Sequence, residues 1–329
     1  MPSPEIELER YLQEKKLRHE QDYDHILGRL LVENLPPNHL HHWLVKWMNV
    51  QLSDIGVKSS GRQVLPRLHF DLVRVQRREA AAHIFAADEF TFIVVTEPMV
   101  DEMLALSTRL VDQNRVFMSV QIAPSATFVD IAHFLVFLQF CLVTSHEYSH
   151  LVRRHLADQQ PYATELGEAL VQSQEFDADG YAIYHELTYL FHGDGRAFTS
   201  NWLKIKNPKA LENTILDCFL IAIMIQYCAR WAGKMQVDSD FASEHPPTPM
   251  RIDNALLITE MWCREIGGRP TAWLTDGTLQ QYFSAAARLF PAQAKLSWNE
   301  MMRWLKSQES EEYRERIRSS TERIRTSEI

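Results

Sequence analysis

The chain alternates between long apolar runs and charged segments, and the spacing of its apolar residues predicts mainly helices. Positions 131–143 and 215–229 are apolar almost throughout, as expected of helices that are buried on all sides. Each run contains polar side chains and is shorter than the roughly 20 apolar residues that a membrane span requires. We therefore expect two core helices and no membrane span.

Start signals define further helices. Asn207-Pro208 combines an N-cap residue with a proline at the first helical position, and Thr248-Pro249 repeats this signal. We predict helices at 208–233 and 248–267 from these signals, and apolar periodicity adds helices at 5–34 (one or two, stopped by Pro36-Pro37), 40–51, 127–156 and 165–190.

Two segments have the pattern of strands instead. Leu68, Phe70 and Leu72 alternate with polar residues, which predicts a half-buried strand at 67–72, with a continuation through residues 73–75, where the alternation shifts by one, as the alternative. Residues 90–96 form a second predicted strand, and a proline two positions later fits the first turn of a helix that continues to residue 110. We therefore expect a small sheet of two to four strands ahead of the helix at 127–156.

Composition and charge exclude some classes of protein. The chain of 329 residues is 46% hydrophobic and 23% charged, which is ordinary for a globular protein. Its net charge of −9 argues against a dedicated nucleic-acid binder.

The four cysteines are isolated from one another, without a C-x-x-C pair, so we expect buried free thiols. The N-terminal residues lack the apolar core of a signal peptide. Both observations predict a cytoplasmic protein.

The strongest chemical signal is the run His146-Glu147-Tyr148-Ser149-His150. Two histidines four residues apart lie on one face of a helix and can share a zinc ion. The glutamate between them can take a proton from a metal-bound water. A catalytic zinc needs a third protein ligand, so the run alone is incomplete.

One way to complete the site fails immediately. The metzincin extension requires a glycine at 153 and a histidine at 156, where this chain has Arg153 and Leu156. His155 is one residue out of register. The third ligand must therefore come from elsewhere.

A glutamate from the following helix is the alternative. Glu165, Glu168 and Glu175 are the candidates by position. Glu175 is favoured because Asp179 follows four residues later on the same face. A carboxylate ligand and a carboxylate that accepts a hydrogen bond from a ligand histidine form a coherent site.

These motifs resemble the gluzincin metallopeptidases of the CAAX-prenyl-protease and HtpX-like family. The matching residues are His-Glu-x-x-His at 146–150, Glu-x-x-Ala-Asp at 175–179 and a His-Pro-x-x-x-x-Arg segment from His245 to Arg251. The resemblance covers about residues 90–260. It implies that His245 or Arg251 stabilises the oxyanion or supports the site.

The chain departs from the family pattern in two respects. Gly180 stands where family members usually carry arginine, and many members are membrane proteins. The chain is therefore more similar to soluble proteins of the same plan, namely minigluzincin-like proteases and the phage-exclusion protease Lit.

Other conspicuous residues fit structural roles better. His185-Glu186 imitates the start of the zinc motif, but Tyr189 occupies the place of the second ligand. Tyr181 and Tyr184 could approach a substrate oxyanion, although packing is the simpler interpretation. His39, His41 and His42 form a local cluster that suits a surface or structural role.

The sequence thus predicts a mainly α (α+β) protein with a zincin-like core. We expect an N-terminal helical region at 1–60, a catalytic domain at 61–270, a helical extension at 271–305 and a charged tail at 306–329, which forms a marginal solvated helix or is disordered.

The expected activity is zinc-dependent hydrolysis of a protein or peptide substrate. His146, His150 and Glu175 would hold one Zn²⁺ per chain, Asp179 would orient a histidine, and Glu147 would be the general base. A Lit-type protease that a protein activator triggers, a non-catalytic zinc-stabilised binding protein and a plain helical interaction domain are the alternatives.

Overall fold

The computed structural model describes residues 3–17, 25–59, 67–76, 81–87, 89–113, 126–153, 155, 165–233, 245–266, 275–291 and 297–327. Their contacts divide the chain into two compact units, Met1–Leu104 and Ala105–Ile329. Helix α3 (Glu97–Gln113) crosses the boundary between them. Helices predominate in the described ranges and one small sheet accompanies them, which confirms the predicted mainly α (α+β) class. The four-part division stays a prediction.

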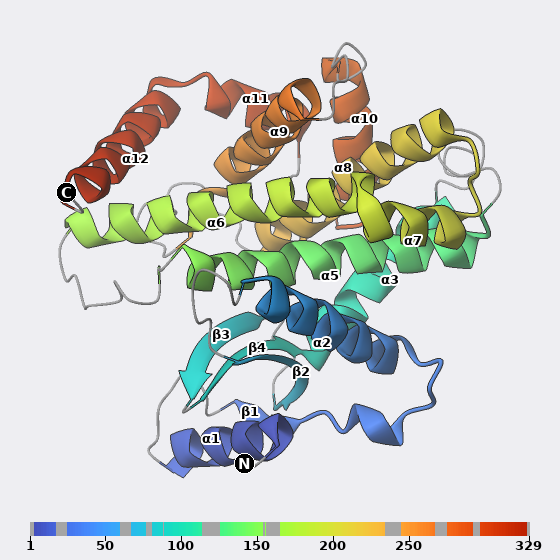
Figure 1. The fold of residues 1–329 in the computed structure, drawn as a ribbon. Helices are drawn as coiled ribbons and strands as arrows, with labels where there is room; N and C mark the ends of the chain where they lie inside the picture. Colours follow the sequence, from blue (N-terminus) through green and yellow to red (C-terminus); the bar gives the residue numbers. More distant parts are fainter. Residues whose placement is uncertain are drawn as a thin grey trace. The chain divides into compact units, whose positions relative to one another are not determined.

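The first unit contains a four-stranded sheet with the strand order β1-β2-β4-β3 (Figure 1). Its strands are β1 (Ile26–Arg29), β2 (Arg67–Val75), β3 (Ala82–Ala87) and β4 (Phe90–Thr96). The central strands β2 and β4 run parallel, and each edge strand pairs antiparallel with its neighbour. Both predicted strands are confirmed as β2 and β4, whereas neither edge strand was predicted.

Three helical segments accompany the sheet in this unit: α1 (Pro4–Leu17), the 3₁₀ helix η2 (Val32–Asn34) and α2 (Leu40–Ser59). The prediction that residues 5–34 form only helices is wrong. After α1 the chain becomes an edge strand, where Gly28 has φ 140°, a conformation that favours glycine. Pairing with Val73–Val75 of β2 outweighs the local helical pattern.

The core of this unit lies between α1 and one face of the sheet. Leu8 and Leu12 pack against Val73, Phe85 and Phe92, all of them buried. Helix α2 contacts β2, and Asn49 of α2 bonds to both backbone groups of Phe70 at 2.8 and 2.9 Å. The Asn49 side chain thus pairs with the backbone N–H and C=O groups of Phe70, which lies outside the part of β2 that pairs with β1.

The second unit is a helical assembly. Its helices are α5 (Phe128–Val152), α6 (Glu165–Phe191), α7 (Gly193–Leu203), α8 (Pro208–Gly233), α9 (Thr248–Glu265), α10 (Asp276–Ala287), α11 (Trp298–Leu305) and α12 (Gln308–Ser327). Helix α5 contacts both α6 and α8, and α9 also packs against these two helices. The predicted starts at Pro208 and Thr248 are confirmed, and Thr127 forms a capping box at the start of α5.

Helices α5 and α8 are the long apolar helices of this unit. Both are long and apolar enough to cross a membrane by length and composition, but 67% and 83% of their apolar windows are buried inside the protein. That burial agrees with the interpretation as core helices. All four cysteines are free and buried, as predicted.

The charged C-terminal segment forms α12, which contacts α6. The helical alternative is therefore correct, but one face of the helix is not solvated. Tyr313 is only 2% exposed, and its hydroxyl donates a hydrogen bond of 3.0 Å to Gln172 of α6.

Candidate metal centre

The two histidines of the His-Glu-x-x-His run lie in the last two turns of α5, opposite the carboxylates of α6. His146 faces Asp179 and His150 faces Glu175, so the two helices run antiparallel here. Ser149 donates hydrogen bonds to the backbone carbonyls of His146 at 2.6 Å and of Ala178 at 3.2 Å. The small, fully buried Ala178 allows this close approach.

Three potential ligand atoms converge at this point. The Nε2 atoms of His146 and His150 lie 3.2 Å apart. His146 Nε2 is 3.3 Å from Glu175 Oε2, and His150 Nε2 is 3.3 Å from the other oxygen, Oε1. Within the described ranges, these three residues form the group of histidine, cysteine and acidic side chains that could hold a metal ion.

The spacing of the two Nε2 atoms and the two Glu175 oxygens fits an ion. Ligand bonds of about 2.0–2.1 Å at tetrahedral angles place neighbouring ligand atoms roughly 3.3 Å apart. The distances of 3.2 and 3.3 Å in the structure match that value. The sequence-predicted ligands are therefore in the arrangement that a metal ion requires.

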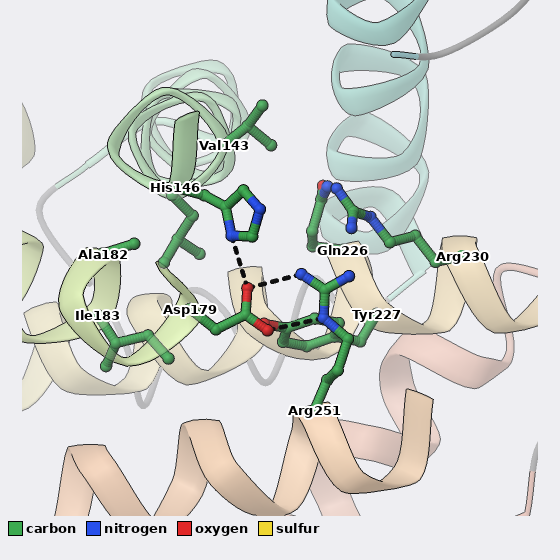
Figure 2. Close-up of a pocket in the computed structure, with 10 residues that line it drawn as sticks. Val143, His146, Asp179, Ala182, Ile183, Gln226, Tyr227, Arg230 and Arg251 are labelled. Carbon is green, nitrogen blue, oxygen red and sulfur yellow. Dashed lines mark hydrogen bonds and ion pairs between the residues drawn. The ribbon is translucent and has the colours of Figure 1, made fainter. Parts of the chain in front are cut away.

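Asp179 orients His146 from behind. Its Oδ1 atom lies 2.9 Å from His146 Nδ1. A dashed line marks this contact in Figure 2. A carboxylate only accepts hydrogen bonds, so Nδ1 carries the proton and Nε2 keeps its lone pair for a metal. Arg251 donates two hydrogen bonds to Asp179, at 2.7 and 2.6 Å, and both side chains are 4% exposed.

A second chain of contacts orients His150. Asp177 Oδ2 lies 3.2 Å from Nε2 of His155, whose Nδ1 is 3.1 Å from His150 Nδ1. Because Asp177 accepts the proton of His155 Nε2, His155 Nδ1 can accept one from His150. This leaves His150 Nε2 free to bind a metal. Arg153 holds Asp177 with hydrogen bonds of 2.6 and 2.9 Å.

His155 and Asp177 are site residues that the sequence analysis missed. His155 was considered only as a displaced metzincin ligand, and its position after the end of α5 gave no sign of an orienting role. The signal was present in the spacing of Asp177 and Asp179, which flank the buried Ala178 two and four residues after Glu175.

The predicted residue His245 also reaches the cluster. Its Nδ1 atom is 2.8 Å from Glu175 Oε2, and its side chain is 46% exposed. His245 therefore contacts a ligand, whereas Arg251 contacts the site through Asp179. Among the described candidates, the structure brings together His146, His150, Glu175, Asp179, His245 and Arg251.

The charges of the cluster favour a cation. Burial opposes protonation of His146, but the carboxylates of Glu175 and Asp179 outweigh it and raise the pKa of His146 to about 9. Burial also opposes ionisation of Glu175 and Asp179, yet His146 and, for Asp179, Arg251 hold the pKa of each carboxyl below its usual range. Positive charge at the convergence point is thus stabilised.

Glu147 follows the first ligand directly and is partly exposed. In the described part of the chain, no hydrogen bond or ion pair engages its carboxylate. Glu147 is therefore available for proton transfer with a molecule bound at the site.

The remaining candidates have other surroundings. Glu165 and Glu168 open α6, and their side chains lie outside the described residues. Tyr184 is 46% exposed, and the ring of Tyr181 stacks on that of His185 at 6.0 Å. His185 is thus a packing residue, as expected.

The histidine cluster of the first unit is a local contact. His39 and His41 approach each other with their Nδ1 atoms 3.3 Å apart, and His41 Nε2 is 3.3 Å from Asp101. Among the residues with defined positions, this cluster does not form a metal-binding group.

Comparison with known proteins gives no relative: no protein-family model, no curated protein and no solved structure matches this chain.

Proposed function

We propose that this protein is a zinc-dependent peptidase in which His146, His150 and Glu175 hold one Zn²⁺ per chain. The observation that carries the proposal is the convergence of the two Nε2 atoms, 3.2 Å apart, on the Glu175 carboxylate, with one oxygen of that carboxylate 3.3 Å from each of them and each histidine oriented through its other ring nitrogen. Two imidazoles and one carboxylate are a ligand set of catalytic zinc, which leaves a position for water.

A bound zinc ion lowers the pKa of a water molecule to about 7 and polarises a carbonyl group. Glu147 is assigned to proton transfer, because it adjoins the ligand His146 and its carboxylate has no partner among the described residues. It accepts a proton from the attacking water and returns it to the amine when the peptide C–N bond breaks.

His245 is assigned to the negative oxygen that develops on the reacting carbonyl. Its ring touches the ligand Glu175 and is partly open to solvent, so it adjoins both the metal site and an approaching substrate. Arg251 has a different role, since both of its hydrogen bonds go to the buried Asp179. It supports the site rather than the substrate.

The proposed substrate is a protein or peptide in the cytoplasm. In the alternative of a triggered Lit-type protease, a protein activator is a second partner. The four buried free thiols agree with a reducing compartment.

The test compares full-length wild type with Glu147→Gln, Glu175→Ala and Glu300→Gln, the last a control at an exposed glutamate of α11. Metal analysis should find one zinc per chain in all but Glu175→Ala. Mapping of new protein termini in cells should find products with wild type and Glu300→Gln, and roughly 10²- to 10⁴-fold fewer with Glu147→Gln.

The outcomes separate the alternatives. Full zinc occupancy with the same biological effect in wild type and Glu147→Gln would identify a non-catalytic zinc-stabilised protein. Products that appear only after an activator is added would identify the triggered protease. Wild type that takes up no zinc would exclude the proposed function.

A further inference from the structure

A small cavity lies beside the first metal ligand, between α5, α6, α8 and α9. It measures about 20 Å³, which is room for a group the size of a water molecule. Its apolar lining residues are Leu142, Val143, Ala182 and Ile183. Its charged and ionisable lining residues include His146, Asp179 and two arginines, Arg230 and Arg251. The lining therefore combines apolar and charged side chains.

The two arginines differ in how their charges are balanced. Arg251 donates both of its hydrogen bonds to Asp179. For Arg230, no hydrogen bond or ion pair is present within the ranges that the structure describes. Two guanidinium groups thus line the cavity with one carboxylate, and Arg251 and His146 already engage that carboxylate.

Arg230 and Gln226 lie one turn apart on α8 and share a face of that helix. Both are partly exposed, although residues 218–225 just before them are fully buried. In Figure 2 both side chains extend from α8 towards the side of the cavity that His146 occupies. Two hydrogen-bond donors, the guanidinium and the amide, therefore project towards the same place.

The electrostatic surroundings agree with an uncompensated cation. Burial and the charge of Arg251 lower the pKa of Arg230, and the more distant carboxylates of Asp179 and Glu175 offset this only in part. A negative group in the cavity would relieve this repulsion. A guanidinium with free donors binds carboxylates through paired hydrogen bonds.

We propose that Arg230, assisted by Gln226, binds a carboxylate of the substrate beside the scissile bond. This inference rests on the proposed peptidase function and gives it a substrate class: peptides with an acidic side chain or a free C-terminal carboxylate at this position. The two sources share one chemistry, and a cavity of this size admits one carboxylate oxygen.

Binding is measured in the full-length Glu147→Gln protein, so that turnover does not interfere. The probes are N-acetyl-alanyl-alanine, its C-terminal amide, and N-acetyl-aspartyl-alanine amide, each titrated by ligand-observed NMR. The arginine is changed in Arg230→Met and in Arg230→Lys. Lys209→Met, at an exposed position of the same helix, removes one positive charge far from the cavity.

At least one carboxylate probe should bind about 10- to 100-fold more tightly than the neutral amide. Arg230→Met should abolish this difference, Arg230→Lys should retain part of it, and Lys209→Met should leave it unchanged. Preference for N-acetyl-alanyl-alanine would identify the C-terminal carboxylate as the bound group, and preference for the aspartyl probe would identify the acidic side chain.

Equal binding of charged and neutral probes, binding of none of them, or a preference that survives in Arg230→Met would overturn the inference. Zinc content is measured on every variant. Failure of the proposed function appears as absent zinc or absent cleavage by wild type, whereas failure of the Arg230 assignment appears as absent carboxylate preference in a protein that holds zinc.

Discussion

His155 lies against His150 with their Nδ1 atoms 3.1 Å apart, so the second candidate metal ligand is oriented by another histidine. Asp177 in turn fixes His155. The first ligand has a simpler support, a direct contact of His146 with Asp179. Both arrangements end at an arginine, Arg153 on one side and Arg251 on the other.

Replacing His155 by leucine should weaken metal binding about 10- to 100-fold, because His150 loses the acceptor that keeps its Nε2 unprotonated. The measurement is competition for zinc with a coloured chelator. His133→Leu, near the start of α5, is the control and should bind zinc like wild type. A His155→Leu protein with wild-type affinity would show that His155 has no orienting role.

Removing the metal should lower the thermal stability of the protein, since ligands from α5 and α6 would no longer be held together. At a free zinc concentration 1,000 times the dissociation constant, binding adds about 4 kcal/mol to the free energy of unfolding. Calorimetry with and without a chelator measures this difference. Glu175→Ala should melt at one temperature in both conditions, and a chelator effect of equal size in that variant would contradict the assigned ligand.

Asp217 should make the protein less stable as the pH rises from about 4 to about 6. Burial raises its pKa to about 6 despite the hydrogen bond from Tyr282. Between about pH 4 and pH 6, the Asp217 carboxyl therefore keeps its proton in the folded state and loses it in the unfolded chain. The free energy of unfolding falls as the pH rises through this range and is constant above it.

Asp217→Asn removes this penalty and should stabilise the protein at pH 7 by on the order of 2 kcal/mol. Urea unfolding of wild type and variant from pH 4 to pH 8 tests the prediction. The advantage of the variant should grow up to about pH 6 and then stay constant. If Asp217→Asn stabilised the protein by the same amount at every pH, the ionisation of Asp217 would not be the cause.

Two glycines of the second unit should respond oppositely to alanine. A Cβ atom at Gly195 would lie 2.2 Å from the backbone oxygen of Tyr189, where α7 meets α6, so Gly195→Ala should destabilise by about 1–3 kcal/mol or more. At Gly180 the nearest atom is a carbon of Ile258 at 3.7 Å, an ordinary contact. Gly180→Ala should stabilise by about 0.5–1 kcal/mol.

Chemical denaturation of the two glycine variants beside wild type checks this pair, and zinc content is measured because Gly180 follows Asp179. Stabilisation by Gly195→Ala would mean that α7 packs less tightly on α6 than the structure indicates.

Much of the second unit follows from local sequence signals. The prolines at 208 and 249 mark helix starts because they fit only the first turn, and the apolar lead-in to His146 identifies a buried helix. The ligands His146, His150 and Glu175 were found because helical spacing converts sequence distance into a shared face.

The errors share a physical cause. Edge strands β1 and β3 are stabilised by pairing with β2 and β4, and their own residues carry no clear alternation. The charged tail was expected to be solvated because half of its residues are charged, but the buried Tyr313 packs it against α6. His155 acts through contacts with Asp177, 22 residues away, that helix periodicity cannot show.

Glu175, Asp177 and Asp179 come from five consecutive residues of α6, yet each has a different role. Glu175 is a candidate metal ligand, Asp177 orients His150 through His155, and Asp179 orients His146. Sliding α6 by one position along α5 would misalign all three at once. Metal affinity should therefore depend on the register between α5 and α6. A shift of that register would disturb all the candidate ligands together rather than one at a time.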